Sequence, residues 1–186
     1  MWDDLLQWDR DTFIYLNALG VSKYDTFWSV ITEIYTWIPL FIFFIYLLYQ
    51  KYPKKEAAFR IITVIALAIF ISLITHWTKI SMARLRPNNE VEINTLIRIL
   101  KNPSDYSFFS GHASSSFSIT VLIVLFLIKK WKWSLLFFLW PILFCMSRIY
   151  VGVHYPLDVI VGGLVGIASG IVFFTLYNRF TKRVTP

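Results

Sequence analysis

Three short clusters of basic residues and histidines lie where long apolar stretches of the chain meet polar loops. The first holds Lys79, Arg84, Arg86 and Pro87, the second holds Ser110, Gly111 and His112, and the third holds Ser147, Arg148, His154 and Asp158. Cations and imidazoles are costly close to lipid, so several of them at the ends of different apolar segments indicate a functional site. Together they supply what phosphoryl transfer through a histidine requires.

The cations suit a phosphate group. The transition state of phosphoryl transfer spreads negative charge over nonbridging oxygens, which fixed cations stabilise. We expect Lys79, Arg86 and Arg148 to bind these oxygens, the arginines through paired contacts and the lysine as a point charge. Ser110 and Gly111 precede an apolar run, so they are predicted to open a helix whose free amide groups also face the phosphate.

The two histidines suit the two tasks of a covalent mechanism. One attacks phosphorus while neutral, and the other protonates the leaving oxygen and later deprotonates water. His154 lies four residues before Asp158, with Pro156 at a predicted helix start, so the carboxylate can fold back onto one ring nitrogen. We therefore predict that His154 is the nucleophile, that Asp158 orients it, and that His112 is the acid and base.

These clusters resemble the motifs K-x6-RP, PSGH and SR-x5-H-x3-D of the type 2 phosphatidic acid phosphatase (PAP2) superfamily. The first and third motifs match with the same spacing, whereas Phe109 stands where the second has proline, which removes a fixed backbone dihedral but no catalytic group. Arg84 matches a frequent additional arginine of the first motif and is expected to be an accessory residue. The resemblance implies a metal-independent phosphatase of bacterial type that uses a phosphohistidine and no cofactor.

Each residue taken alone has a simpler explanation. A lone arginine or lysine at a helix end can extend toward the lipid headgroups, His112 can cap a helix, and Asp158 can favour a helix N-terminus. None of these explanations predicts three correctly spaced groups on one side of a membrane, so the joint interpretation is preferred.

The composition predicts an integral membrane protein. Hydrophobic residues make up 57% of the chain and aromatic residues 19%, and the mean hydropathy is +0.60. Apolar stretches close to the ~20 residues that span a bilayer lie at 27–49, 60–80, 113–129, 133–149 and 157–177. We expect an all-α, polytopic membrane bundle of about five transmembrane helices, forming one domain over residues 1–186.

The distribution of charge predicts how the bundle is oriented. Basic residues gather in the first loop, the third loop and the tail: Lys51, Lys54, Lys55, Arg60, Lys129, Lys130, Lys132, Arg179, Lys182 and Arg183. The positive-inside rule makes these segments cytoplasmic, so the N-terminus, outside, and all three motifs are extracytoplasmic and the C-terminus is cytoplasmic. The net charge of +7 lies in these loops and in the phosphate site, so no nucleic-acid partner is expected.

Three further segments are open to more than one interpretation. Apolar residues alternate with carboxylates near the N-terminus, which predicts an amphipathic helix at the membrane interface that packs on the bundle or contacts lipid. The loop 87–109 is either a lid that selects substrate or a solvated connector. Gly162, Gly166 and Gly170 allow close helix approach, within the monomer or at the face of a homodimer.

Access to the site favours a lipid substrate, because a phosphate at headgroup depth reaches helix ends while its tail stays in the bilayer. The preferred substrate is the polyprenyl (undecaprenyl) pyrophosphate of cell-wall synthesis. Phosphatidylglycerophosphate, phosphatidic acid and lipid A phosphates remain alternatives. So do a lipid phosphotransferase that uses the same phosphoenzyme and a nonenzymatic lipid-binding membrane protein.

Overall fold

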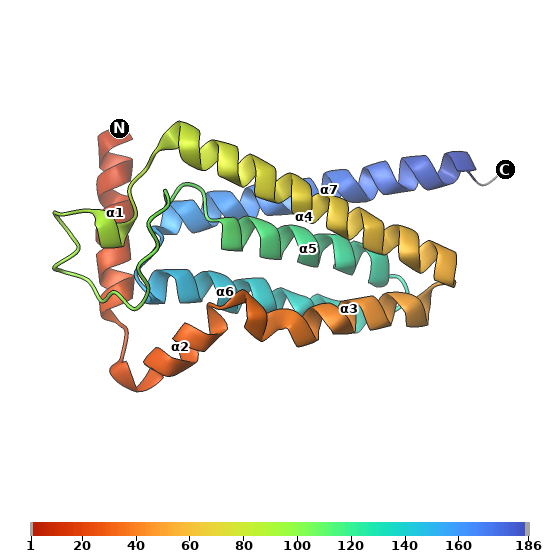
Figure 1. Ribbon diagram of the computed structural model, residues 1–186, viewed down its shortest axis with the longest axis horizontal. Helices are drawn as coiled ribbons and strands as arrows, with labels where there is room; N and C mark the ends of the chain where they lie inside the picture. Colours follow the sequence, from red (N-terminus) through yellow and green to blue (C-terminus); the bar gives the residue numbers. More distant parts are fainter. Residues whose placement is uncertain (1, 185–186) are drawn as a thin grey trace.

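The computed structural model describes residues 2–184, with side chains to residue 181. Its helices are α1 (Trp2–Ala18), η1 (Ser22–Tyr24), α2 (Asp25–Ile31), η2 (Ile34–Trp37), α3 (Ile38–Lys51), α4 (Lys54–Met82), η3 (Pro87–Asn89), α5 (Gly111–Leu127), η4 (Lys132–Phe138), α6 (Leu139–Tyr150) and α7 (Pro156–Val184), where η marks a 3-10 helix. Helices α3 to α7 run along the long axis of the molecule, and α1 crosses one end of them (Figure 1).

The predicted all-α membrane bundle is confirmed. Within the described residues, four helical segments are long and apolar enough to cross a membrane, namely Ile34–Lys51, Lys54–Asn89, Lys132–Tyr150 and Pro156–Thr181. The fifth apolar helix is α5, which has 17 residues. The expected count of about five spans therefore corresponds to four long helices arranged around a shorter one.

Helix α5 is at the centre of the bundle. It contacts α3, α4, α6 and α7, and most of its side chains are buried although serines alternate with apolar residues in its first half. The hydroxyl of Ser115 donates to the carbonyl of Gly111 at 2.7 Å, and that of Ser118 donates to the carbonyl of Ser115 at 3.0 Å. This bonding back to its own helix pairs the hydroxyls of these serines inside the bundle.

The glycine seam of α7 faces α5. A methyl group added at Gly162, Gly166 or Gly170 would lie 2.6, 2.4 or 2.9 Å from the carbonyl oxygens of Ser110, Ser114 and Ser118, respectively. These separations are too short for any side chain, so the glycines allow the two backbones to touch. The seam is therefore occupied by packing within the chain.

The first predicted span, residues 27–49, is interrupted between α2 and α3, which corrects the boundary expected from sequence. Pro39 lies in the first turn of α3, where its missing N–H leaves no helical hydrogen bond unmade. Side chains bind carbonyls at the end of α2: Thr36 Oγ1 donates to Val30 O at 2.6 Å, and Trp37 Nε1 donates to the last residue of α2 at 2.9 Å. The break is thus stabilised by the side chains of Thr36 and Trp37, which hydropathy alone assigns to one continuous apolar stretch.

The other spans are found with shifted ends. Helices α4 and α7 extend beyond the predicted 60–80 and 157–177, because a helix can continue into polar residues where the apolar run has stopped. The predicted span 133–149 begins as the 3-10 helix η4 and becomes α-helical at Leu139, which places Pro141 in the first turn of α6. Pro141 therefore marks the start of a helix and does not break one.

The predicted N-terminal helix exists as α1 and packs on the end of the bundle. Its buried residues are Asp9, Phe13 and Asn17, which recur every fourth position and form one face. Phe13 contacts the ring of Tyr155 with 5.4 Å between centroids, and Asn17 binds the backbone of Arg98 through both of its side-chain polar atoms. The face of α1 that packs on the bundle is partly polar, whereas several apolar side chains elsewhere on this helix remain exposed.

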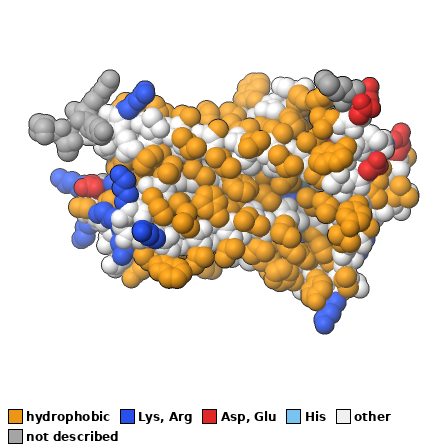
Figure 2. All heavy atoms as spheres, turned by 180° about the vertical axis from the view of Figure 1, so that it is seen from behind, with side chains coloured by type: hydrophobic (Ala, Val, Ile, Leu, Met, Phe, Trp, Pro, Cys, Tyr) orange, Lys and Arg blue, Asp and Glu red, His pale blue; other side chains and the backbone are white. Residues whose placement is uncertain are grey.

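The two ends of the bundle differ in charge. Figure 2 shows lysine and arginine side chains gathered at the end opposite α1, where the exposed lysines are Lys54, Lys55, Lys129, Lys130 and Lys132. The side chains of Lys182 and Arg183, which the charge argument also used, lie outside the described part. All three motifs lie at the other end, where α4 and α6 finish and α5 and α7 begin (Figure 1).

Candidate active site

The three motifs meet around a cavity of about 780 Å³ at the α1 end of the bundle. Five of the predicted site residues line it: Lys79 from α4, Arg86 from the following loop, Gly111 and His112 from the start of α5, and Arg148 from α6. Further walls come from the break between α2 and η2, from α4 and from the loop 87–109. The loop therefore forms part of the cavity wall.

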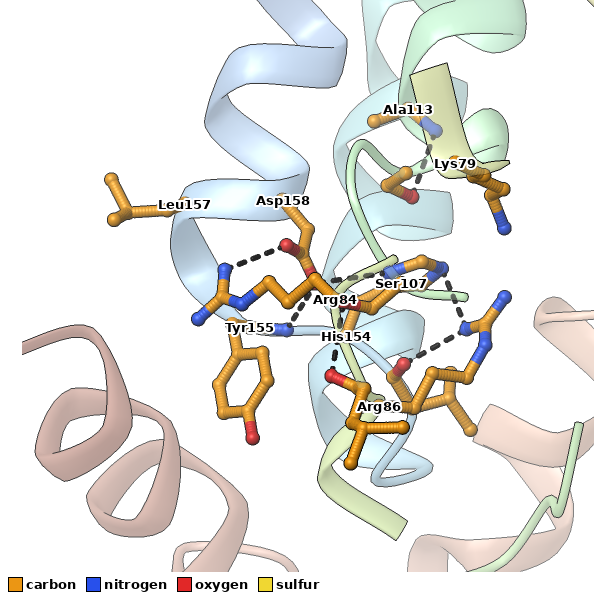
Figure 3. Close-up of polar contacts among 12 residues, drawn as sticks. Lys79, Arg84, Arg86, Ser107, Ala113, His154, Tyr155, Leu157 and Asp158 are labelled. Carbon is orange, nitrogen blue, oxygen red and sulfur yellow. Dashed lines mark hydrogen bonds and ion pairs between the residues drawn. The ribbon is translucent and has the colours of Figure 1, made fainter. Parts of the chain in front are cut away.

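His154 is fully buried, and its two ring nitrogens have different partners (Figure 3). Nδ1 lies 3.3 Å from Oδ2 of Asp158, and Nε2 lies 2.9 Å from Nη1 of Arg86. A carboxylate only accepts hydrogen bonds and a guanidinium only donates them. Both contacts therefore require the tautomer with the proton on Nδ1 and the lone pair on Nε2.

Asp158 is held where it can orient His154. Its Oδ2 also accepts the backbone N–H of Tyr155 at 3.0 Å, and its Oδ1 accepts Nη1 of Arg84 at 2.8 Å. The carboxylate lies in the first turn of α7, four residues after the histidine, as the spacing predicted. Each of these contacts of the carboxylate is with a hydrogen-bond donor.

Burial lowers the pKa of His154 well below its ordinary value, and the positive charges of Arg86, Arg148 and Lys79 lower it further. An imidazole in this environment is neutral at neutral pH. A neutral ring with a lone pair on Nε2 is the form in which a histidine can attack phosphorus.

Arg86 is held by hydrogen bonds to three residues. Its Nε donates to the backbone carbonyl of Asp105 at 2.8 Å, its Nη2 to the carboxylate of the same residue at 2.9 Å, and its Nη1 to Val153 O at 2.9 Å as well as to His154. The guanidinium is therefore oriented by contacts within the chain, with one side on His154 and the other on Asp105.

Lys79 lies beside Arg86 and shares its counter-ion. Its Nζ lies 2.6 Å from Oδ2 of Asp105, whose other oxygen binds Arg86. Burial opposes ionisation of Asp105, but the hydrogen bond from Lys79 and the charge of Arg86 lower its pKa below the ordinary value. In this structure the carboxylate of Asp105 is paired with Lys79 and Arg86, two of the three cations that the sequence assigned to phosphate.

Arg148 is buried at the far wall of the cavity. Its Nη1 donates to Oγ1 of Thr32, at the break between α2 and η2. Its Nε has no hydrogen-bond partner among the described residues and no exposed surface. An unpaired guanidinium N–H inside a protein is costly, and other atoms of Arg148 line the cavity.

The second motif begins α5 as predicted, but only part of it lines the cavity. Ser110 is the N-cap: its Oγ accepts the N–H of Ala113 at 3.4 Å, and its own N–H donates to the backbone carbonyl of Asp158 at 2.9 Å. It does not line the cavity, whereas Gly111 and His112 do. The ring of His112 packs beside Phe144, with 4.7 Å between ring centroids.

Arg84 faces away from the cavity. Its guanidinium bridges Asp158 and the buried Asp9 of α1, at 2.8 and 2.7 Å, and lies 4.0 Å from the ring centroid of Tyr155. Arg84 therefore contacts Asp158 from outside the cavity. The cations that line the cavity are Lys79, Arg86, Arg148 and Lys101.

Sequence reasoning missed Asp9, Asp105, Thr32 and Lys101. Asp9 had a detectable signal, because it repeats at four-residue spacing with Phe13 and Asn17, yet a carboxylate on an amphipathic helix is normally assigned to the solvated face. The other three lie in segments with no regular pattern. Within the described residues, no group of three or more histidine, cysteine or carboxylate side chains is arranged to hold a metal ion.

The chain is similar in sequence to known lipid phosphatases. The chain is 26% identical to the lipid A 4'-phosphatase of Bacteroides thetaiotaomicron over 180 residues, covering 95% of this chain and 80% of that protein. It is 37% identical to the undecaprenyl-diphosphatase of Sulfolobus acidocaldarius over 155 residues, covering 81% and 66%.

The fold is shared with a solved membrane phosphatase. The crystal structure of a transmembrane PAP2 type phosphatidylglycerolphosphate phosphatase from Bacillus subtilis matches with a TM-score of 0.70 at 18% identity, covering 98% of this chain and 88% of that one. Residues 57–182 match the model of the PAP2 superfamily, and this segment includes all three motifs. The chain therefore belongs to the PAP2 superfamily and is an integral membrane phosphatase of that family.

Proposed function

We propose that this phosphatase removes the terminal phosphate of a membrane lipid through a phosphohistidine formed on His154. The observation that carries the proposal is the pair of contacts on its ring. Asp158 holds the proton on Nδ1, and Arg86 meets the lone pair of Nε2 at the edge of a cavity lined by cations. A neutral, oriented imidazole beside fixed positive charges suits nucleophilic attack on a phosphate.

In the first step, Nε2 of His154 attacks phosphorus and the bond from phosphorus to the leaving oxygen breaks. His112 protonates that oxygen, so the leaving group departs neutral or with one charge fewer. Lys79, Arg86 and Arg148 bind the nonbridging oxygens, on which negative charge is spread. Asp158 stabilises the positive charge that the imidazole ring acquires.

In the second step, His112, now lacking its proton, removes one from water. The resulting hydroxide attacks phosphorus, the Nε2–phosphorus bond breaks, and orthophosphate leaves. This step returns His154 to its neutral form and His112 to its protonated form. The cycle consumes one water and needs no redox partner.

A lipid diphosphate is the preferred substrate, with a polyprenyl diphosphate as the specific candidate. Besides the three predicted cations, Lys101 also lines the cavity, which offers a positive charge to a second phosphate. Lys101 is paired at 2.6 Å with Glu33, which also lines the cavity. The likeness to an undecaprenyl-diphosphatase supports the same choice.

A lipid A phosphate is the second candidate. It is favoured by the likeness to lipid A 4'-phosphatases over nearly the whole chain. Phosphatidylglycerophosphate and phosphatidic acid would use the same cations, and a phosphotransferase would pass the phosphoryl group to another lipid in place of water.

Phosphate release by the purified protein in detergent micelles tests the proposal. Undecaprenyl diphosphate, lipid A, phosphatidylglycerophosphate and phosphatidic acid are supplied separately, each with excess EDTA, and both orthophosphate and lipid products are measured. We expect the diphosphate to give the highest kcat/KM, with no loss on chelation. A phosphorylated lipid product without orthophosphate would indicate transfer. Absence of turnover with every lipid would refute the proposed function.

We further propose that the site faces away from the cytoplasm. The lysine-rich turns lie at the opposite end of the bundle from the cavity (Figure 2). Because basic loops are retained in the cytoplasm, this arrangement favours an extracytoplasmic active site and a cytoplasmic C-terminus.

A further inference from the structure

Asp9 is a fully buried carboxylate that the proposed reaction does not use. It belongs to α1, outside the residues 57–182 that match the family model. Its Oδ1 accepts the N–H of Leu157 at 2.8 Å, and its Oδ2 accepts Nη2 of Arg84 at 2.7 Å. Carboxylates are seldom buried unless they are paired, and both oxygens of Asp9 are bound to donors.

Arg84 connects Asp9 to the active site. One of its terminal nitrogens binds Asp9. The other binds Oδ1 of Asp158 at 2.8 Å, as Figure 3 shows. The second oxygen of Asp158 lies against Nδ1 of His154. A continuous chain of contacts therefore runs from α1 to the proposed nucleophile, and the ring of Tyr155 packs against the guanidinium in its middle.

We propose that Asp9 is a positioning residue for the phosphatase reaction, which holds Arg84 and shares its charge so that the charge of Asp158 remains available to His154. This inference rests on the proposed role of His154. If Arg84 paired with Asp158 alone, the two charges would cancel, and the imidazole would face a neutral ion pair. With Asp9 the three groups carry a net charge of −1, which stabilises the cationic ring of the phosphohistidine.

The ionised form of Asp9 is the one that fits these contacts. On balance the pKa of Asp9 is raised, chiefly by burial and also by the charge of Asp158, whereas the Leu157 N–H and Arg84 lower it. Neither Leu157 nor Arg84 can accept a hydrogen bond at the contacting nitrogen, so a proton on either oxygen of Asp9 would face a donor. These hydrogen bonds therefore favour the negative charge on Asp9.

Asp9 also contributes to structure, and the experiment must separate the two roles. By accepting the N–H of Leu157 it satisfies a free amide at the start of α7. Breaking a buried ion pair destabilises a protein whatever its function. A purely structural role would lower the melting temperature and would act on activity independently of Asp158.

A double-mutant cycle tests the proposal. Asp9→Asn keeps the size of the side chain and one acceptor for Leu157 but removes the charge. We measure kcat, KM and the rate of phosphohistidine formation for Asp9→Asn in the wild-type background and in an Asp158→Asn background. Asp11→Asn, which changes an exposed carboxylate of the same helix, is the matched control. Melting temperature and gel filtration report folding.

We expect Asp9→Asn to lower kcat by about tenfold or more, as is typical when an outer hydrogen-bond partner of a reacting group is lost, with KM nearly unchanged. In the Asp158→Asn background the same change should lower kcat by less than about twofold, because Asp158 is the route by which Asp9 acts. Asp11→Asn should have the activity of the wild type in both backgrounds.

Equal losses in the two backgrounds, or wild-type kcat in Asp9→Asn, would overturn the proposal. If Asp9→Asn does not fold, Asp9→Glu takes its place in the cycle, since it keeps the charge but displaces Arg84 by one methylene. The same non-additivity is then required. A wild-type protein that forms no phosphohistidine would refute the proposed function, and that outcome is distinct from an additive cycle in a working enzyme.

Discussion

Arg86 donates a hydrogen bond to Nε2 of His154 across 2.9 Å, so the nitrogen proposed to attack phosphorus is covered by a cation. A phosphate oxygen that accepts the Nη1–H of Arg86 would uncover the lone pair at the moment of binding. The same guanidinium would then stabilise the oxygens of the phosphate that the lone pair attacks. Exposure of the nucleophile is in this way coupled to occupation of the phosphate site.

Replacement of His154 by asparagine should abolish turnover, because no atom remains to form the covalent bond to phosphorus. The loss of kcat should reach several orders of magnitude, as for other covalent nucleophiles. Vanadate binding, measured by calorimetry, should persist through Lys79 and Arg148. Retention of about a tenth of the wild-type rate would contradict the assignment.

Replacement of His112 by alanine should block a different step. Attack by His154 can still proceed on an activated aryl phosphate whose leaving group needs no proton, whereas water then lacks its general base. Acid-labile phosphate should accumulate on His154 in this variant, as detected by mass spectrometry of rapidly denatured protein. Labile phosphate on His112 in a variant lacking His154 would show that the two roles are reversed.

Asp105→Asn should strengthen phosphate binding. The carboxylate occupies Lys79 and Arg86, so an incoming phosphate must displace it, whereas asparagine keeps the backbone carbonyl that orients Arg86. We expect inhibition by orthophosphate to tighten by roughly tenfold, equivalent to about 1.4 kcal/mol, and KM to fall. Glu56→Gln, at the far end of the bundle, is the control. Weaker inhibition would instead mean that Asp105 chiefly positions the two cations.

The buried imidazole predicts how stability depends on pH. Burial and the charge of Arg86 lower the pKa of His154, so the folded protein binds this proton less readily than the unfolded chain, whose value is about 6.5. Relative to His154→Gln, the wild type should keep its full stability above about pH 6.5 and lose it as the pH falls below that value. Melting temperatures of both proteins between about pH 5 and 8 check this sign. A constant difference over that range would contradict it.

The proposed orientation can be tested by labelling intact cells with a membrane-impermeant maleimide. Single cysteines at Asn89 and Lys55, both exposed, are compared in a background with Cys145→Ala. Asn89 lies in the loop at the cavity end, and Lys55 lies in the lysine-rich turn. The first should react and the second should not. The opposite pattern would move the active site to the cytoplasmic side.

The sequence predicted the site where the chemistry is local and missed it where contacts are distant. The short spacing of His154 and Asp158 brings them into contact, because His154 lies just before α7 and Asp158 lies in its first turn. Asp9 and Arg84 are 75 residues apart, and Thr32 and Arg148 are 116 apart. Their contacts depend on how separate helices pack, and no spacing within one segment encodes that.

The fold, like the site, was predicted where the signal is local and was missed where it depends on specific contacts. Apolar length predicted α4 and α7, since a bilayer requires about 20 apolar residues. The break between α2 and α3 could not be predicted from hydropathy, because it depends on hydrogen bonds from the side chains of Thr36 and Trp37 to carbonyls at the end of α2. The face of α1 that packs on the bundle could not be predicted for a related reason. Its buried polar side chains, Asp9 and Asn17, bind groups in distant segments of the chain.

The glycine seam between α5 and α7 has a consequence for how this phosphatase can diversify. It locks together the two helices whose first turns carry His112 and Asp158, through main-chain surfaces that no side-chain exchange on the lipid-facing helices would disturb. Other walls of the cavity come instead from the break between α2 and η2, from α4 and from the loop before α5. New headgroups can therefore be accommodated by remodelling those walls, while the spacing of the reacting groups is inherited unchanged.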